Sequence, residues 1–258
     1  MSAKGNERFS GTPALRSQAA RHGVVPASCT VILGFLSFLV LAAAAAHGQY
    51  VTITGNSIAH FQATFATEEF PHLLASQVNI WGVDSVPCSY FLSTNGNGTP
   101  LLYFYVPAQT TVAVLIDSTK DIRTGVPVAQ HMLCIETTIG LLLRRNPNIK
   151  IVVANTPPWT QFNPCTNANN PPTILTAMQA YNAAYADPTT GLQALYPNNV
   201  RVADVYTPAA ESNGWANPFY MSGPCGTHPG AEFIWSISWG HFVSSYTTLV
   251  MGAINDQW

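Results

Sequence analysis

Five short runs of apolar and β-branched residues alternate along the chain with longer segments in which apolar positions recur every three or four residues. Turn residues bound the short runs, and their apolar character on both faces is typical of strands buried in a parallel sheet. These predicted strands are Val51–Gly55, Val78–Val83, Thr111–Asp117, Ile149–Ala154 and Val200–Val205. The longer segments predict helices over Ile58–Ser76, Val126–Arg145, Ile174–Leu195 (broken near Pro188) and Ala231–Ile254.

The alternation of strands and helices favours an α/β fold formed by one domain, residues 49–258. We predict a three-layer α/β/α sandwich with a flavodoxin-like parallel sheet of about five strands. Two stretches, Ser93–Pro100 and Asn155–Thr173, are rich in turn-forming residues and predict loops. The second follows a predicted strand, and open α/β sheets bind their ligands at the carboxyl ends of strands.

The N-terminal region, residues 1–48, has a different pattern. A stretch with four basic residues precedes Thr30–Ala46, which is apolar and carries no charge. A basic region followed by an apolar run and small residues predicts a signal peptide, cleaved near residues 46–49. The run is about 17 residues long, which is marginal for a bilayer span, so a signal anchor is the alternative. We expect a secreted or periplasmic, cell-envelope protein, associated with a membrane only if this segment is retained.

Charge narrows the range of partners. Hydrophobic residues make up 47% and charged residues 9% of the 258 positions, and the apolar N-terminal segment contributes part of this imbalance. Residues 49–258 contain six basic and eleven acidic residues, a formal net charge of −5. No stripe of basic residues is present that could bind phosphates, so we expect no nucleic-acid partner.

Four cysteines follow the predicted signal peptide: Cys88, Cys134, Cys165 and Cys225. An even number of cysteines in an exported chain predicts two disulfides, with three possible pairings. The chain has no CxxC motif and no other zinc-type spacing, so we expect no metal site.

Ser57 carries the clearest chemical signal. It follows the strand Val51–Gly55 at a tight turn into a helix, where the hydroxyl is held out from the sheet and the backbone N–H is free. That placement suits a nucleophile that supplies its own oxyanion donor. Far downstream, His228 lies in the turn-rich segment Cys225–Pro229, where it could serve as a base. Together these two residues predict an acyl hydrolase.

In order and spacing, four blocks between Tyr50 and Ile254 resemble the SGNH, or GDSL-like, hydrolases. The family's Gly-Asp-Ser-(Leu/Ile) block corresponds to Gly55–Ile58, and its oxyanion-glycine block looks like Trp81–Ser85. Its Gly-x-Asn-Asp block corresponds to Ser118–Asp121, and its Asp-x-x-His-Pro block to Cys225–Pro229.

The resemblance implies an exported serine ester hydrolase in which Ser57 and His228 are catalytic. Ser85, in place of the oxyanion glycine, and Lys120, in place of the asparagine, would bind the oxyanion and the substrate. The family uses no metal or organic cofactor, and its substrates include lipid esters, small acyl esters and acetylated polysaccharides. We therefore expect no cofactor and a small-molecule or carbohydrate ester as the substrate, with carbohydrate deacetylase and lipase-like activities as two options.

Four supporting positions depart from the family's pattern, and each departure has a physical meaning. Asn56 can cap the turn as an aspartate does. Ser85 keeps a backbone N–H but is strained if the turn requires a positive φ. Lys120 replaces a neutral amide by an ammonium, which Asp117 or Asp121 could capture in a salt bridge.

The fourth departure, Cys225 in place of the aspartate, removes the acid that holds the histidine tautomer. In serine proteases the loss of that acid lowers the rate by about 10⁴-fold. Three accounts stay open. Cys225 pairs with Cys165 and fixes His228 by geometry, which we favour; Glu211 or Glu232 orients His228; or a backbone carbonyl does so, leaving a Ser–His dyad.

A function from another class also fits these departures: a non-catalytic binding module for glycans or cell-envelope components, in which Ser57 and His228 are relics. A carboxylate or carbonyl beside the ring nitrogen of His228 that faces away from Ser57 would favour the enzyme. A salt bridge that draws Lys120 away from the oxyanion site would favour the binding module. A third hypothesis, a membrane-anchored structural protein, depends on retention of the N-terminal segment.

Several other residues have weaker predictions. Trp159, Trp215 and Tyr220 lie in loops near the predicted site, where they could stack on a substrate or fill the core equally well. His131 lies on a predicted helix, where we expect it to pack or to face solvent, since no partner is evident in the sequence.

Overall fold

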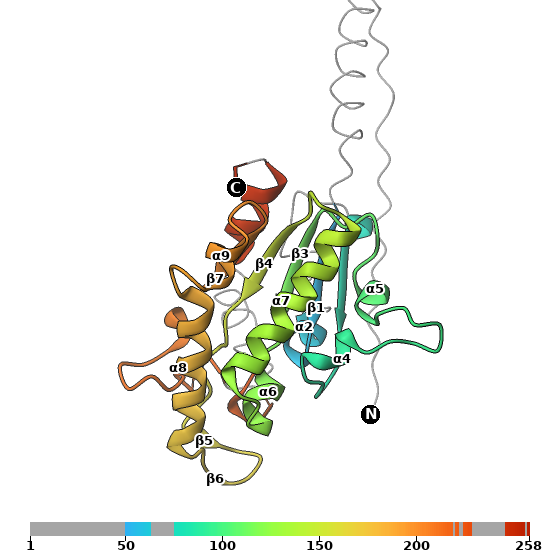
Figure 1. Cartoon of the computed structure of the whole chain (residues 1–258). Helices are drawn as coiled ribbons and strands as arrows, with labels where there is room; N and C mark the ends of the chain where they lie inside the picture. The colour runs from blue at the N-terminus through green and yellow to red at the C-terminus, as the bar shows by residue number, and fades with distance from the viewer. Residues whose placement is uncertain (1–49, 63–74, 219, 222–223, 229–245, 256) are drawn as a thin grey trace, which may run out of the picture. The chain divides into compact units, whose positions relative to one another are not determined.

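Five parallel strands form the centre of the computed structural model, in the order β2-β1-β3-β4-β7 (Figure 1). They are β1 (Val51–Gly55), β2 (Val78–Gly82), β3 (Val112–Ile116), β4 (Lys150–Ala154) and β7 (Val200–Ala203). Every neighbouring pair in this sheet is parallel. When these five strands are numbered in chain order, their spatial order is 2-1-3-4-5, which is the order of flavodoxin-like folds. The predicted flavodoxin-like sheet of about five strands is therefore confirmed.

The structure describes residues 50–62, 75–218, 220–221, 224–228, 246–255 and 257–258. The predicted signal peptide lies outside these residues, as do Glu232 and most of the predicted helices Ile58–Ser76 and Ala231–Ile254. The proposed boundary between residues 48 and 49 accordingly stays a prediction. Among the described residues, no helix has the length and apolar character needed to cross a membrane.

Successive side chains of a strand point to opposite faces of the sheet, and both faces of this sheet are packed. On one face, Val112, Val114 and Ile116 of β3 lie in a core cluster with residues of α2 (Ser57–Gln62) and of the helical segment 246–254. On the other face, Ala113 and Leu115 lie in a cluster with residues from five helices. These helices are α4 (Ser89–Leu92), α5 (Leu102–Tyr105), α7 (Val128–Arg145), α8 (Pro172–Ala186) and α9 (Leu192–Leu195).

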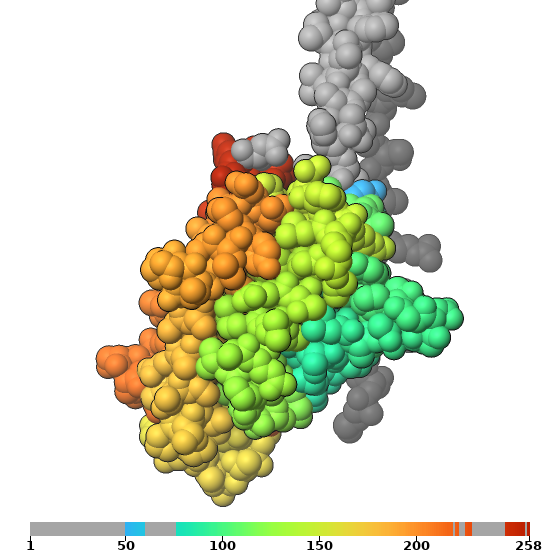
Figure 2. All heavy atoms as spheres, viewed as in Figure 1, coloured from blue at the N-terminus to red at the C-terminus, as the bar shows by residue number. Residues whose placement is uncertain are grey.

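This arrangement is the predicted three-layer α/β/α sandwich. The space-filling view shows α7 and α8 covering much of one face of the sheet (Figure 2). The predicted break near Pro188 is also confirmed, because α8 ends at Ala186 and α9 begins at Leu192. Arg144 and Arg145 occupy the last turn of α7, where cations interact favourably with the helix dipole.

Short elements were not predicted. They include α4, α5 and α6 (Thr119–Thr124), together with a hairpin of β5 (Phe162–Asn163) and β6 (Ala168–Asn169) inside the predicted loop Asn155–Thr173. Elements of two to six residues are too short to show a hydrophobic period, so pattern alone cannot identify them.

Two disulfides join the elements around the sheet. Cys88, just before α4, is bonded to Cys134 on α7, and Cys165, in the turn of the β5–β6 hairpin, is bonded to Cys225. The prediction of two disulfides is confirmed, and so is the favoured pairing of Cys165 with Cys225.

Candidate active site

The turn that carries Ser57 is fixed by a close approach between β1 and β3. Gly55 has a φ of +147°, and a Cβ atom at this position would lie 1.9 Å from the carbonyl oxygen of Ile116, so only glycine fits. The N–H of Asn56 donates to that same carbonyl at 2.9 Å, and its side-chain Oδ1 accepts from the N–H of Ile58 at 2.9 Å. Asn56 thus caps the turn as predicted, and Ser57 begins α2 at the carboxyl end of β1.

The loop that carries His228 is held from its other side. Gly226 has a φ of +64°, and a Cβ atom there would lie 1.8 Å from Thr160 Oγ1. The N–H of Thr160 donates to the Gly226 carbonyl at 2.9 Å, and the Cys165–Cys225 disulfide ties the same loop to the β5–β6 hairpin. The residues just before His228 are therefore anchored both by a hydrogen bond and by a covalent bond.

Ser57 and His228 meet although 171 positions separate them in the sequence, with Ser57 Oγ 2.7 Å from His228 Nε2. His228 Nδ1 lies 3.0 Å from the hydroxyl oxygen of Thr227, a fully buried residue. If Nε2 accepts from the serine hydroxyl, the ring proton lies on Nδ1 and is donated to Thr227; these hydrogen bonds are the basis for assigning this tautomer. The geometry is that of a nucleophile and its base.

The outer ring nitrogen thus faces a hydroxyl group contributed by Thr227. Cys225 is in a disulfide and carries no charge, as the favoured account expected. Glu211, one of the two glutamates considered for this role, lines a different cavity, and Glu232 lies outside the described residues.

A cavity of about 210 Å³ opens beside the serine and the histidine. All four predicted site residues, Ser57, Ser85, Lys120 and His228, line it. The remaining lining residues are Asn56, Asp84, Thr119, Arg123 and Cys225. The residues come from the ends of β1, β2 and β3 and from the His228 loop. The cavity therefore lies at the carboxyl edge of the sheet and next to β1 and β3, where flavodoxin-like folds bind their ligands.

Ser85 has a positive φ, the backbone conformation in which serine was expected to be strained. Its φ is 59°, in the left-handed region that glycine enters without cost. The side chain is exposed, and the turn follows β2, whose end is tied to β1 by the hydrogen bond from the Val83 N–H to the Gly55 carbonyl at 2.9 Å. Cys225, which also lines the cavity, has a φ of 59° as well.

Lys120 is not captured by either aspartate that follows the same strand. Asp121 Oδ2 lies 2.6 Å from His131 Nδ1, with which it pairs instead. Asp117 is buried, and its Oδ1 has no hydrogen-bond partner among the described residues. Burial, followed by the charge of Asp121, raises the pKa of the Asp117 carboxyl well above its ordinary value. Within the part of the chain that the structure describes, Lys120 Nζ makes no ion pair, so it stays available to the cavity.

Two further residues of the site were not predicted: Arg123, which lines the cavity, and Thr227, which contacts the His228 ring without lining the cavity. Arg123 lies three positions after Lys120 on α6, and its Nη2 is 3.5 Å from Thr227 Oγ1. Thr227 is the neighbour of His228 and contacts its ring. The spacing of Arg123 from Lys120, one helical turn, was a usable signal, but recognising it required the short helix α6. Thr227 gave no such signal, because the sequence does not show whether a polar residue next to a histidine directs its side chain toward the imidazole or away from it.

Two of the three loop aromatics, Trp159 and Trp215, are buried, and Tyr220 is partly exposed. Trp159 is 2% exposed and Trp215 is 6% exposed, and both belong to a core cluster with Tyr181. Trp159 therefore fills the core, with the guanidinium of Arg123 5.6 Å from its ring centroid. Trp215 lines a separate cavity of about 460 Å³ that also reaches Gly226.

His131 is buried and has partners that the sequence did not suggest. Nδ1 contacts Asp121, and Nε2 contacts the hydroxyl of Tyr185. Cys88 Sγ, a carboxylate oxygen of Asp121 and a ring nitrogen of His131 all lie within 4.8 Å of one another. Because Cys88 is in a disulfide, its sulfur is not a thiolate, and the cluster does not offer the donor set of a metal site.

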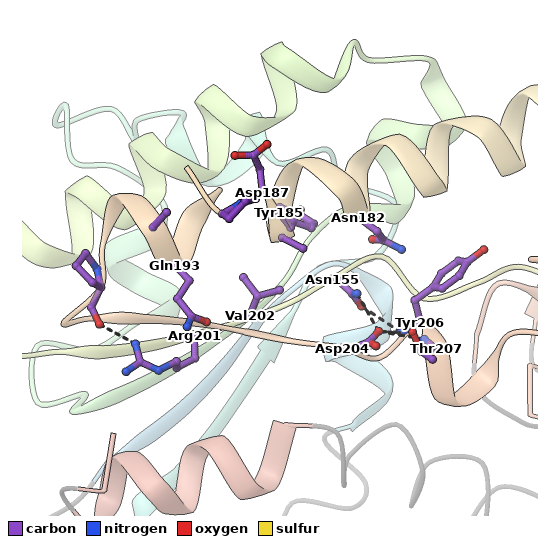
Figure 3. Close-up of a pocket in the computed structure, with 14 residues that line it drawn as sticks. Asn155, Asn182, Tyr185, Asp187, Gln193, Arg201, Val202, Asp204, Tyr206 and Thr207 are labelled. Atoms are coloured by element: carbon purple, nitrogen blue, oxygen red, sulfur yellow. Dashed lines mark hydrogen bonds between the residues drawn. The ribbon is translucent and has the colours of Figure 1, made fainter. Parts of the chain in front are cut away.

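A larger cavity, of about 710 Å³, lies beside β7 and shares no lining residue with the cavity at Ser57 (Figure 3). Its polar groups serve the backbone and one another. Asp204 Oδ1 accepts from Asn155 Nδ2 at 3.0 Å and from the N–H groups of Tyr206 and Thr207 at 3.1 and 3.0 Å. Asp204 thus caps the chain after β7, and size alone does not make this cavity the reactive site.

Neither a protein-family model nor a curated protein matches the sequence. Solved structures do match it. A GDSL-like lipase from Bacteroides thetaiotaomicron is 16% identical, covers 82% of this chain and 90% of its own, and superposes with a TM-score of 0.57. A carbohydrate esterase family 3 protein from Talaromyces cellulolyticus is 13% identical, with 81% and 99% coverage and a TM-score of 0.51. An acetyl esterase mutant with an acetate ion is 14% identical, with 81% and 100% coverage and a TM-score of 0.52.

At such identities the similarity defines the fold. The chain has an SGNH/GDSL-like hydrolase fold, as the resemblance of its sequence blocks predicted.

Proposed function

We propose that this chain is an exported serine ester hydrolase that uses Ser57 as the nucleophile and His228 as the general base. The observation that supports this most strongly is the 2.7 Å contact between Ser57 Oγ and His228 Nε2 at the edge of a cavity. A nucleophile in contact with a base, beside a space for the acyl group, is the minimum arrangement for acyl transfer.

In the proposed reaction, Ser57 Oγ attacks the ester carbonyl while its proton passes to His228 Nε2. The N–H groups of Ser57 and Ser85 and the ammonium of Lys120 stabilise the oxyanion. Collapse of the tetrahedral intermediate breaks the ester bond, and the alcohol leaves with the proton from His228. Water, deprotonated by the same ring, then attacks the acyl-serine, and the acid product departs as the serine hydroxyl is restored. No cofactor is needed, because protein groups carry every step.

The missing aspartate lowers the expected rate without removing the mechanism. Thr227 can hold the ring orientation of His228, but a hydroxyl does not neutralise the imidazolium that forms when the proton is taken up. The acid contributes about 10⁴-fold in serine proteases, and the remaining groups still accelerate the reaction by about 10³–10⁴-fold over water. We therefore expect a slow esterase.

The cavity favours a short acyl group. Its volume of about 210 Å³ is below the range of about 300–1,000 Å³ that holds drug-sized ligands. A carbohydrate esterase and an acetyl esterase are among the proteins that share the fold. An acetyl ester of a small molecule or a carbohydrate is accordingly the substrate that we propose, in preference to a long-chain lipid.

Export is part of the proposal. The two disulfides fit an oxidising compartment, secreted or periplasmic and cell-envelope, which the basic and apolar N-terminal pattern also predicts. N-terminal sequencing of the exported product would show whether the segment is cleaved or retained as a membrane anchor.

One observation favours the second candidate, a non-catalytic binding module on the same fold. The position of the family's acid is occupied by a disulfide-bonded cysteine, Cys225. Among the residues that the structure describes, no carboxylate pairs with the Lys120 ammonium beside the cavity, and this argues against the binding module, for which a salt bridge drawing Lys120 away was expected.

Hydrolysis of a short-chain aryl acetate and of an acetylated sugar tests the proposal, using the full chain with its disulfides formed. The matched control is Ser57→Ala, which removes one oxygen at the surface of the cavity. Activity that disappears in Ser57→Ala would support the serine esterase. Equal background rates in both proteins on both substrates, with cooperative melts showing that both are folded, would favour the binding module.

A further inference from the structure

The cavity beside Ser57 has an unusual share of the chain's positive charge. Residues 49–258 contain six basic residues, and two of them, Lys120 and Arg123, line this one cavity. They are three positions apart on α6, which places their side chains on the same face of the helix. In a chain whose net charge outside the N-terminal segment is negative, this pairing concentrates cations at the reacting groups.

Neither cation is neutralised by a carboxylate among the described residues. Lys120 Nζ makes no ion pair there, and within the same residues the polar and ring contacts of the Arg123 guanidinium are with the hydroxyl of Thr227 and the face of Trp159. The Trp159 ring lies on one side of the guanidinium, and the Arg123 side chain is exposed, so it keeps N–H donors that the described residues do not use. Asp84 is the acid that lines the described part of the cavity, so two cations face one carboxylate.

The two other acids near α6 do not change this balance. Asp121 is on the helix itself but is bonded to His131, and both side chains are buried. Asp117, at the end of β3, has a pKa raised well above its ordinary value by burial and then by the charge of Asp121, which favours its neutral form. The cavity therefore presents an excess of positive charge to a ligand.

We propose that this cavity selects esters that carry an anionic group, a carboxylate, sulfate or phosphate, close to the scissile bond. Arg123 binds the anionic oxygens through its planar set of N–H donors, and Lys120 adds a second positive charge while it faces the oxyanion. The hydrolytic part of this inference rests on the function proposed above. The recognition part rests only on the two cations and on the cavity that they line.

Binding of small unreactive ligands tests the recognition part without any hydrolysis. The probes are 4-hydroxybenzoate and 4-hydroxybenzamide, which have similar shapes and differ in charge. We expect the full chain to bind the carboxylate about tenfold more tightly at low salt, as a charge-assisted hydrogen bond provides. Arg123→Gln should remove most of that difference, and added salt should weaken it. 4-Hydroxybenzenesulfonate and 4-hydroxyphenyl phosphate distinguish which anion binds best.

Arg144→Gln is the matched control, since Arg144 is an exposed arginine at the far end of α7 and outside the cavity. It removes the same charge from the molecule and should leave the ratio of the two dissociation constants unchanged. Equal binding of the benzoate and the benzamide by the unaltered chain would overturn the proposal. An equal loss in Arg123→Gln and Arg144→Gln would also overturn it, because the preference would then come from net charge.

Hydrolysis of 4-acetoxybenzoate and 4-acetoxybenzamide separates this inference from the proposed function. A higher kcat/KM for the benzoate, lost in Arg123→Gln, would support both. Cleavage of both esters at equal kcat/KM would support the esterase and overturn the anion preference. If neither ester is cleaved but the benzoate still binds through Arg123, the esterase fails and the anion site stands.

Discussion

Two histidines lie near residues of the short helix α6, His131 beside Asp121 and His228 next to the Thr227 that Arg123 contacts, and their surroundings are opposite in kind. His131 is 1% exposed, with the Asp121 carboxylate on one ring nitrogen and the Tyr185 hydroxyl on the other. His228 has the Ser57 hydroxyl on one nitrogen and the Thr227 hydroxyl on the other, and it borders a cavity. The histidine that is paired with an acid is thus the one that a substrate cannot reach.

The difference shows that an acid–histidine pair does not by itself define a reactive site. Burial raises the pKa of the Tyr185 hydroxyl well above its ordinary value, so it stays protonated and donates to His131. Every hydrogen-bonding position of that imidazole is then filled by the protein. In contrast, the His228 ring contacts the Ser57 hydroxyl, which can act as a nucleophile, next to space for an acyl group.

Backbone strain follows the same division. Among the described residues, three that are not glycine have a positive φ, namely Ser85, Asn167 and Cys225. Ser85 and Cys225 both line the cavity beside His228. Strained backbone collects at functional sites because the surrounding structure must hold reacting groups in unfavourable positions. The buried cluster around His131 has no such residue and behaves as part of the core.

Removing the His131 side chain should have the largest effect, on stability. His131→Ala leaves the buried Asp121 carboxylate without its hydrogen-bond donor, and leaving a buried charged group unsatisfied costs about 3 kcal/mol or more in the free energy of unfolding. Urea denaturation measures the loss. In an Asp121→Asn background the same substitution should cost less, because no charge is left unpaired. A kcat of the folded protein that falls with no loss of stability would mean that His131 is part of the reacting site.

Removing the His228 side chain should have the reverse effect, on activity. His228→Ala is expected to lower the kcat for an aryl acetate by about 10²-fold, because a complete triad contributes about 10⁶-fold and the acid's share is about 10⁴-fold. The melting temperature should change by only a few degrees. A loss of activity near 10⁶-fold would indicate that a carboxylate supports His228 from the residues that the structure does not describe.

Much of the fold could be predicted from the sequence, because its signals are local. A continuous apolar run such as Val112–Ile116 indicates a strand buried on both faces, and Pro188 marks the end of a helix. The short helix α6 gave no such signal, since its six residues span fewer than two turns. Its absence from the prediction concealed the placement of Arg123 on the cavity wall.

The site was predictable where a backbone constraint accompanies the chemistry. Ser57 comes two positions after Gly55, where the close approach of β3 admits only glycine, and its role could be predicted from that turn. The partners of the histidines could not, because Asp121 and Tyr185 come to His131 from 10 and 54 positions away. Such contacts depend on how α6, α7 and α8 pack, which no local pattern records.

The smallest effect should come from relieving the strain at Ser85. Ser85→Gly removes the Cβ from a residue with a φ of 59°, and the gain of about 1–2 kcal/mol in the folded state is offset by about 0.5–1 kcal/mol of added freedom in the unfolded chain. We expect a net gain near 0.5–1 kcal/mol by urea denaturation, with kcat/KM unchanged because the backbone N–H remains. Asn167→Gly, at a φ of 52° in the β5–β6 hairpin, is the matched comparison and should gain less, since asparagine tolerates this conformation. A stabilised Ser85→Gly that loses activity would instead assign the serine hydroxyl, and not only its N–H, to the binding of the substrate.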